Sequence, residues 1–230
     1  MNLRQSLIAT AAATALLGTL STAADAASFG TNGISFDEDT TVKFTFFESH
    51  GAFQSALSIF EVGEGSVLTP MSVLFEEIKP SDNGAANEWK GTFGNTVVGS
   101  QSVKFTFLAG KSYTLGLTTP ATASGFVYST TALNIPLSQQ AVFGDPGTLL
   151  PELNLGSTDA LDTPEFFIEG DLASGPVLIS LDDRGNGNDI DFQDFTITAE
   201  AVPEPATLAG LGMVIGSLVV SRRRRSSANA

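Results

Sequence analysis

Apolar and polar residues alternate with a period of two through the middle of the chain. Val42, Phe44 and Phe46 alternate with Lys43 and Thr45. Because successive side chains of a β-strand point to opposite faces, this pattern predicts a short strand with one buried face. The same alternation predicts further strands at residues 103–107, 113–117, 126–128 and 177–181.

Turn-forming residues separate the predicted strands, as in Ser-Asp-Asn-Gly at 81–84 and Asp-Pro-Gly at 145–147. No segment of this region has the 3.6-residue period of an amphipathic helix. We therefore expect an all-β fold, an antiparallel β-sandwich of the jelly-roll type. The pentapeptide Val-Lys-Phe-Thr-Phe occurs at 42–46 and again at 103–107, which indicates either two related halves or two strands built from the same few residue types.

The N-terminus has the three parts of a secretory signal peptide. Arg4 supplies a positive charge, and an apolar run of small and aliphatic residues follows at 7–20. Ala24 and Ala26 then form an Ala-x-Ala cleavage site. We expect a signal peptidase to remove residues 1–27.

A second three-part segment follows residue 202. Pro203, Glu204 and Pro205 interrupt the preceding strand, because proline fixes φ and lacks an N–H donor. Residues 206–220 carry no charge and predict an apolar helix, shorter than the ~20 residues of a comfortable membrane span. Four consecutive arginines come next, Arg222, Arg223, Arg224 and Arg225. By the positive-inside rule they favour a cytoplasmic tail, with the preceding domain across the membrane.

This order of Pro-Glu-Pro, short apolar helix and arginine cluster resembles the PEP-CTERM sorting signal of Gram-negative bacteria. The resemblance implies that residues 203–230 hold the protein in the inner membrane. A membrane-embedded exosortase would then cleave it near Pro-Glu-Pro and pass it outward. The resemblance also implies a final location at the cell surface or in the extracellular polysaccharide matrix. A permanent C-terminal anchor is the alternative, in which the mature protein keeps the residues after Pro205.

The composition of the remaining domain, residues 28–202, excludes several kinds of partner and binding site. It has 23 acidic and six basic residues, so its net charge is −17. An acidic domain repels phosphate backbones, which excludes nucleic acid as a partner. The chain has no cysteine, which excludes disulfides and thiolate metal sites. It has one histidine, which excludes any site that needs two imidazoles.

Residues 182–194 carry the densest set of candidate ligands. These are Asp182, Asp183, Asn186, Asn188, Asp189, Asp191 and Asp194. Calcium takes six to eight oxygen ligands, so these side chains are candidate calcium ligands. The segment departs from an EF-hand, because Arg184 and Gln193 occupy two ligand positions. The alternative is a metal-free turn in which aspartates cap their own backbone and Arg184 pairs with a neighbour.

The apolar alternation shifts by one residue within this segment. A β-bulge at Gln193 and Asp194 would restore it and place Asp189, Asp191 and Asp194 on one outer side. The segment at 183–195 also resembles the closing motif of an uncharacterised Asp-rich domain that is common in PEP-CTERM proteins. Shorter resemblances lie at 126–129 and 140–144. They imply a surface or matrix β-sandwich, with calcium as a candidate ligand and no established enzymatic activity.

Signatures of catalysis are weak. His50 is expected in an exposed turn, and no Gly-x-Ser-x-Gly elbow is present. Glu76 and Glu77 are adjacent on a predicted strand, so their side chains point to opposite faces and cannot form a facing carboxylate pair. Trp89 is either a core residue or a loop residue that stacks on a sugar, and it is the candidate carbohydrate contact.

The sequence thus predicts an exported, non-enzymatic β-sandwich protein. Its expected partners are a signal peptidase, an exosortase-type membrane protease and extracellular polysaccharide, which divalent ions would bridge to the acidic domain. Three alternatives stay open: a carbohydrate-binding (lectin-like) module, a polysaccharide-active hydrolase, and a permanently anchored periplasmic protein.

Overall fold

The computed structural model of the 230-residue chain describes residues 28–51, 53–80, 90–135, 138–147, 170–184 and 192–203. Its named elements within these ranges are strands and two short 3₁₀ helices. The strands are β1 (Ser28–Gly30), β2 (Gly33–Ser35), β3 (Thr40–Ser49), β4 (Ala56–Val62), β5 (Leu68–Glu76), β6 (Ser102–Phe107), β7 (Ser112–Thr118), β8 (Phe126–Tyr128), β9 (Ala141–Gly144), β10 (Val177–Leu181) and β11 (Phe195–Ala201). The 3₁₀ helices are η1 (Glu64–Ser66) and η2 (Thr131–Leu133).

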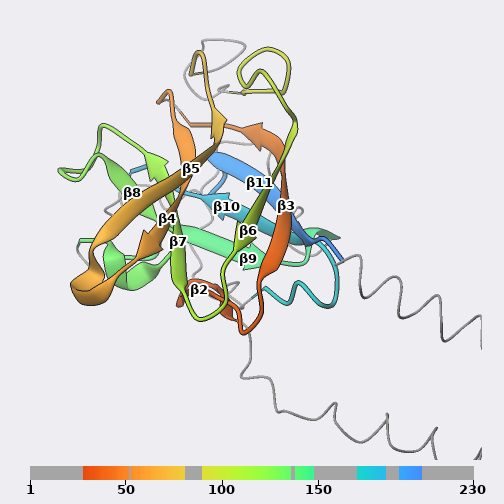
Figure 1. The fold of residues 1–230 in the computed structure, drawn as a ribbon. Helices are drawn as coiled ribbons and strands as arrows, with labels where there is room; N and C mark the ends of the chain where they lie inside the picture. The colour runs from red at the N-terminus through yellow and green to blue at the C-terminus, as the bar shows by residue number, and fades with distance from the viewer. Residues whose placement is uncertain are drawn as a thin grey trace, which may run out of the picture.

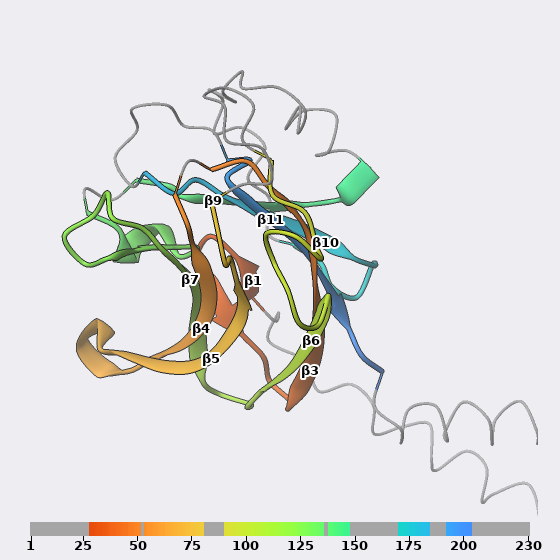
Figure 2. The same ribbon diagram turned by 90° about the horizontal axis from the view of Figure 1, so that it is seen from above.

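The strands form two antiparallel sheets that pack face to face (Figures 1 and 2). One sheet has the order β1-β2-β7-β4-β5, with β8 paired to β7. The other has the order β6-β3-β11-β10-β9. Every segment predicted as a strand from its alternation lies within one of these strands, and the predicted all-β sandwich is confirmed.

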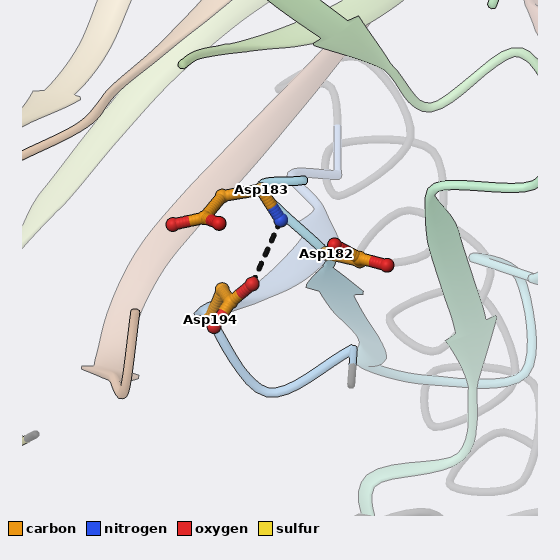
Figure 3. A group of neighbouring side chains, drawn as sticks. All are labelled: Asp182, Asp183 and Asp194. Atoms are coloured by element: carbon orange, nitrogen blue, oxygen red, sulfur yellow. Dashed lines mark hydrogen bonds between the residues drawn. The ribbon is translucent and has the colours of Figure 1, made fainter. Parts of the chain in front are cut away.

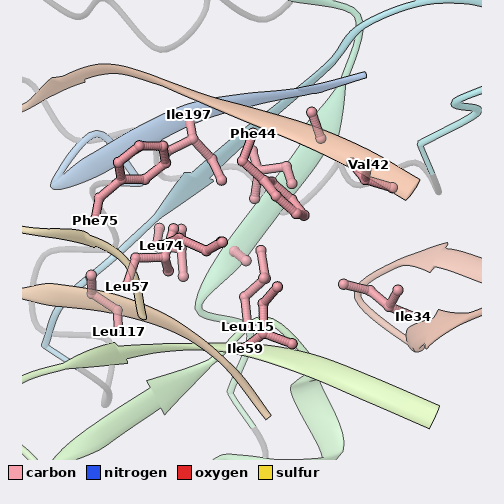
Figure 4. Packing of buried hydrophobic residues seen from close by; sticks show 14 of the residues in the cluster. Ile34, Val42, Phe44, Leu57, Ile59, Leu74, Phe75, Leu115, Leu117 and Ile197 are labelled. Carbon is pink, nitrogen blue, oxygen red and sulfur yellow. The ribbon is translucent and has the colours of Figure 1, made fainter. Parts of the chain in front are cut away.

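The core between the sheets comes from the alternating apolar residues. Val42 and Phe44 of β3 and Ile197 of β11 point from one sheet, and Leu57 of β4 and Leu115 of β7 point back from the other (Figure 4). All five side chains are fully buried. Aromatic rings fill much of the remaining space, with edge-to-face pairs such as Phe29–Phe143, Phe46–Phe195 and Phe107–Tyr113.

The repeated pentapeptide forms two neighbouring strands of one sheet. β3 and β6 pair antiparallel, which places Lys43 opposite Lys104. The threonine hydroxyls on the same face bond across the strands, with Thr41 Oγ1 2.8 Å from Thr106 Oγ1. Glu200 of β11 lies 2.6 Å from the Lys43 ammonium and offsets the repulsion between the two lysines.

A predicted β-bulge at Gln193 and Asp194 is wrong, because the residues before β11 form a turn. The irregularity lies instead on β3, where Phe47 has no register partner on β11. Asp194 is only 7% exposed, so it is buried rather than solvated, and Asp189 and Asp191 lie outside the described residues. The shift in the apolar pattern marked the start of a strand, since a turn can change the phase of alternation as readily as a bulge does.

The described strands begin at Ser28 and end at Ala201, within the predicted domain of 28–202. One further backbone bond extends the last strand, from Val202 N to the Thr41 carbonyl at 2.8 Å. The predicted signal peptide and C-terminal apolar helix lie outside the described residues. Within the described ranges, no helix has the length and apolar character needed to cross a membrane.

We expect Phe107→Ala to lower the free energy of unfolding by about 3–5 kcal/mol, because it leaves a cavity among packed rings. Phe107 is 0% exposed and contacts the rings of Phe36, Phe44 and Tyr113. The matched control is Phe47→Ala, since Phe47 is 45% exposed; its cost should be below about 1 kcal/mol. Urea unfolding measures both, and equal costs would contradict the assigned core.

Candidate functional site

Three of the seven candidate calcium ligands lie in the described residues, and the structure brings them together. One oxygen from each of Asp182, Asp183 and Asp194 lies within 4.8 Å of the others. We call these three residues the acidic cluster. The other four candidates, Asn186, Asn188, Asp189 and Asp191, lie outside the described residues, so the structure does not place them.

Strand pairing explains why residues twelve positions apart in sequence meet. Asp182 directly follows β10 and Asp194 directly precedes β11. β10 and β11 pair antiparallel with Leu181 opposite Phe195, so the two aspartates lie at the same end of the pair. Asp182, Asp183 and Asp194 are 0%, 3% and 7% exposed. The acidic cluster is therefore buried, rather than a solvated loop tip.

Backbone N–H groups already bind two of the carboxylates. Asp183 N donates to Asp194 Oδ2 at 2.8 Å (Figure 3). Arg184 N donates to Asp182 Oδ1 at 2.7 Å. The second bond is the backbone capping that the metal-free alternative describes. A carboxylate has about four acceptor directions. These bonds are therefore compatible with a metal ion on the same carboxylates.

The end of β3 closes one side of the acidic cluster. His50 N and Gly51 N donate to the Asp194 carbonyl, at 3.1 and 3.4 Å. Gly51 lies so close to the cluster that a Cβ placed on it would be 2.6 Å from Asp183 Oδ2. Only glycine therefore lets the chain pass this carboxylate without displacing it.

A fourth carboxylate, Glu77, reaches the same region from the other sheet. It directly follows β5, is 2% exposed, and accepts bonds from Ser49 Oγ and from Ser55 N at 2.8 Å. Burial, together with the nearby charge of Asp183, raises the pKa of Glu77 to about 7, although the two hydrogen bonds act to lower it. Its neighbour Glu76 is exposed, as the prediction of opposite faces requires.

These buried acids favour a hard cation. Carboxylates that are this close repel one another, and burial removes the water that would screen them. A divalent ion relieves both costs, and an all-oxygen ligand set suits calcium or magnesium rather than a softer metal. The acidic cluster could therefore hold a metal ion.

The only histidine of the chain, His50, lies beside a carboxylate. His50 was expected in an exposed turn, but its side chain is only 9% exposed and lies 3.2 Å from Glu48 Oε1. Lys90 Nζ contacts the other oxygen of Glu48 at 2.7 Å. Burial acts to raise the pKa of Glu48, but the bonds from His50 and Lys90 outweigh it and lower the pKa. Glu48 thus contacts both His50 and Lys90.

The remaining predicted site residues fall mostly outside the described ranges. Trp89, the candidate sugar contact, lies outside them, as do Glu204 and Pro205. The four arginines at 222–225 also lie outside. Pro203 is described and follows the last sheet hydrogen bond, which Val202 makes.

Comparison with known proteins identifies the C-terminal segment. The sequence model of the PEP-CTERM protein-sorting motif matches residues 201–225. The chain thus carries this sorting motif, which indicates export across the membrane, processing by an exosortase-type membrane protein and sorting toward the cell surface. No curated protein and no solved structure matches the chain.

We expect Glu77→Gln to remove a loss of stability between pH 4.5 and about 7. Glu77 binds its proton more tightly when folded than when unfolded, so its contribution is complete below 4.5 and is lost as the pH rises through about 7. Above that pH the variant should be more stable than wild type, by up to ~3 kcal/mol.

Urea unfolding in chelator at about pH 5 and about pH 8 measures the difference between variant and wild type. Glu76→Gln, on the exposed face, is the matched control and should track wild type at both values. A Glu77→Gln difference that does not change with pH would contradict the assignment.

Proposed function

We propose that this chain is an exported, non-enzymatic β-sandwich protein of the cell surface or extracellular matrix, stabilised by calcium in the acidic cluster. The observation that carries the proposal is the sorting motif joined directly to a folded domain. The motif match begins at Ala201, the last residue of β11. Cleavage near Pro-Glu-Pro at 203–205 would therefore release every described strand.

The position of the first strand is compatible with removal of the signal peptide before sorting. β1 begins at Ser28, directly after the predicted signal peptide, and Phe29 is a core residue at 1% exposed. Removal of residues 1–27 by a signal peptidase would leave Phe29 in the chain. Both processing events would therefore act next to the domain without cutting into it.

The burial of the acidic cluster argues for a structural role of the metal. A catalytic metal keeps an open position for water or substrate, whereas these three aspartates are at most 7% exposed. A buried ion bound between β10, β11 and the end of β3 would instead fix these ends together. Extracellular calcium modules bind with Kd values of roughly 10⁻⁴–10⁻³ M, which suits a protein that binds calcium only after export.

Contact with acidic polysaccharide would use other groups. Bridging by divalent ions needs carboxylates that reach solvent, and the acidic cluster does not. Asp37, Glu38 and Asp39 are consecutive and exposed, so acids of this kind would supply the bridging. The domain's net charge of −17 keeps it soluble and makes its association with acidic polymers depend on divalent ions.

We expect calcium to stabilise the full chain, purified in detergent, relative to chelator at matched ionic strength. A ligand bound only by the native state at 100 times its Kd adds about 2.7 kcal/mol. Asp183→Asn and Asp194→Asn should remove this calcium-dependent rise in thermal midpoint.

Asp37→Asn is the matched control, because Asp37 is exposed. It should keep the full calcium response. If calcium leaves the midpoint of wild type unchanged, or if magnesium at equal concentration reproduces the whole effect, the calcium proposal fails while the sorting assignment stands.

We expect replacement of the four arginines at 222–225 by serine to reduce sorting in a host with an exosortase. The arginines favour the orientation in which the C-terminal tail stays cytoplasmic, and serine removes that preference. Immunoblots of an internal epitope separate the unprocessed from the processed chain. Lys104→Ser is the control for loss of a positive charge, and processing of the arginine variant at the wild-type rate would contradict this expectation.

A further inference from the structure

Gln140, Asp182 and Asp194 lie side by side at the neighbouring ends of β9, β10 and β11. Leu181 of β10 lies opposite Ala141 of β9 and Phe195 of β11. One residue further along, Asp182 therefore lies between Gln140 and Asp194. The bond from Asp182 N to the Gln140 carbonyl, at 3.1 Å, continues the β9–β10 register to this position.

Side chains directly opposite in an antiparallel pair share a face of the sheet. Leu181, Ala141 and Phe195 all face the core, so Gln140 and Asp182 share the other face. In Figure 3 the carboxylate of Asp182 points toward the pale green β9, whereas that of Asp183 points toward β3. Asp182 is thus turned toward the strand that Gln140 precedes.

The side chain of Gln140 carries a buried acceptor that makes no hydrogen bond to any residue that the structure describes. Gln140 is 1% exposed, and its Oε1 has no hydrogen-bond partner within the part of the chain that the structure describes. The orientation of the amide is fixed, because Nε2 donates to the Gln139 carbonyl at 2.8 Å and to Ser138 Oγ at 3.1 Å. A carbonyl accepts only, so the nitrogen must lie on that side and the oxygen on the other.

A buried, unused oxygen is costly unless something binds it, and an amide oxygen is a good calcium ligand. We infer that Gln140 Oε1 is a neutral ligand of the cation that Asp182 and the acidic cluster hold. This inference rests on the proposed calcium site and adds a residue from outside the 182–194 segment. A neutral ligand adds to the coordination number without adding to the repulsion between the three carboxylates.

The test compares Gln140→Met with wild type, as the full chain in detergent. Methionine has nearly the same length but no amide oxygen. We expect calcium affinity, measured by isothermal titration, to fall about tenfold or more. In chelator the thermal midpoint should stay equal to that of wild type or rise, since the variant no longer buries an unpaired acceptor. A purely structural glutamine would instead lower the midpoint in calcium and in chelator alike.

Two further variants sharpen the result. Gln140→Glu restores an oxygen and should bind calcium at least as tightly as wild type. Gln139→Met is the matched control. Gln139 Nε2 donates to the Ala141 carbonyl at 3.0 Å, and its loss should leave calcium affinity unchanged. Wild-type affinity in Gln140→Met, or equal loss in Gln140→Met and Gln140→Glu, would overturn the inference. If wild type binds no calcium, the proposed site itself fails, and that outcome is visible before any variant is made.

Discussion

The pairing of β11 between β3 and β10 is the interaction on which the rest of the structure depends. β11 is the middle strand of its sheet, and its inward residues, Phe195, Ile197 and Ala199, are all buried. Its first residue follows Asp194 of the acidic cluster, and its last residue begins the sorting motif. One strand thus closes the core, positions the candidate metal site and carries the segment that directs export.

At the start of β11, buried negative charges oppose the stability of the fold. The core supplies apolar contacts along β11, but at its start Asp182, Asp183 and Asp194 are buried together and Glu77 approaches from the other sheet. Backbone N–H groups bind Asp182 and Asp194, while burial and the charge of Asp183 raise the pKa of Glu77. In our proposal, the stability of this end depends on protons or cations, whereas that of the aromatic core does not.

Alternation of apolar residues was enough to predict β3, β6, β7, β8 and β10, because a half-buried strand needs only a period of two. It could not predict the pairing, since the register of β3 with β11 joins residues about 150 positions apart through backbone bonds that any sequence can make. The density of aspartates identified residues 182–194 as a candidate metal site. The burial of Asp194 could not be predicted, because it depends on the chain at the end of β3. Nothing in the sequence placed Glu77 or Gln140 near the aspartates, because each approaches the acidic cluster only through the position of its strand.

Sequence separation also fixes when the acidic cluster can form. β3 cannot complete its pairing until β11 is present, and β11 ends directly before the sorting motif. In a chain that crosses the membrane from its N-terminus, the central strand of this sheet is thus the last to emerge. The carboxylates of Asp183 and Asp194 meet beside Gly51 only at that point, when the last strand of the domain is available. The ligands of the acidic cluster come from strands that the rest of the sandwich must first bring together. A cation bound there would therefore stabilise the completed domain and not its earlier folding stages.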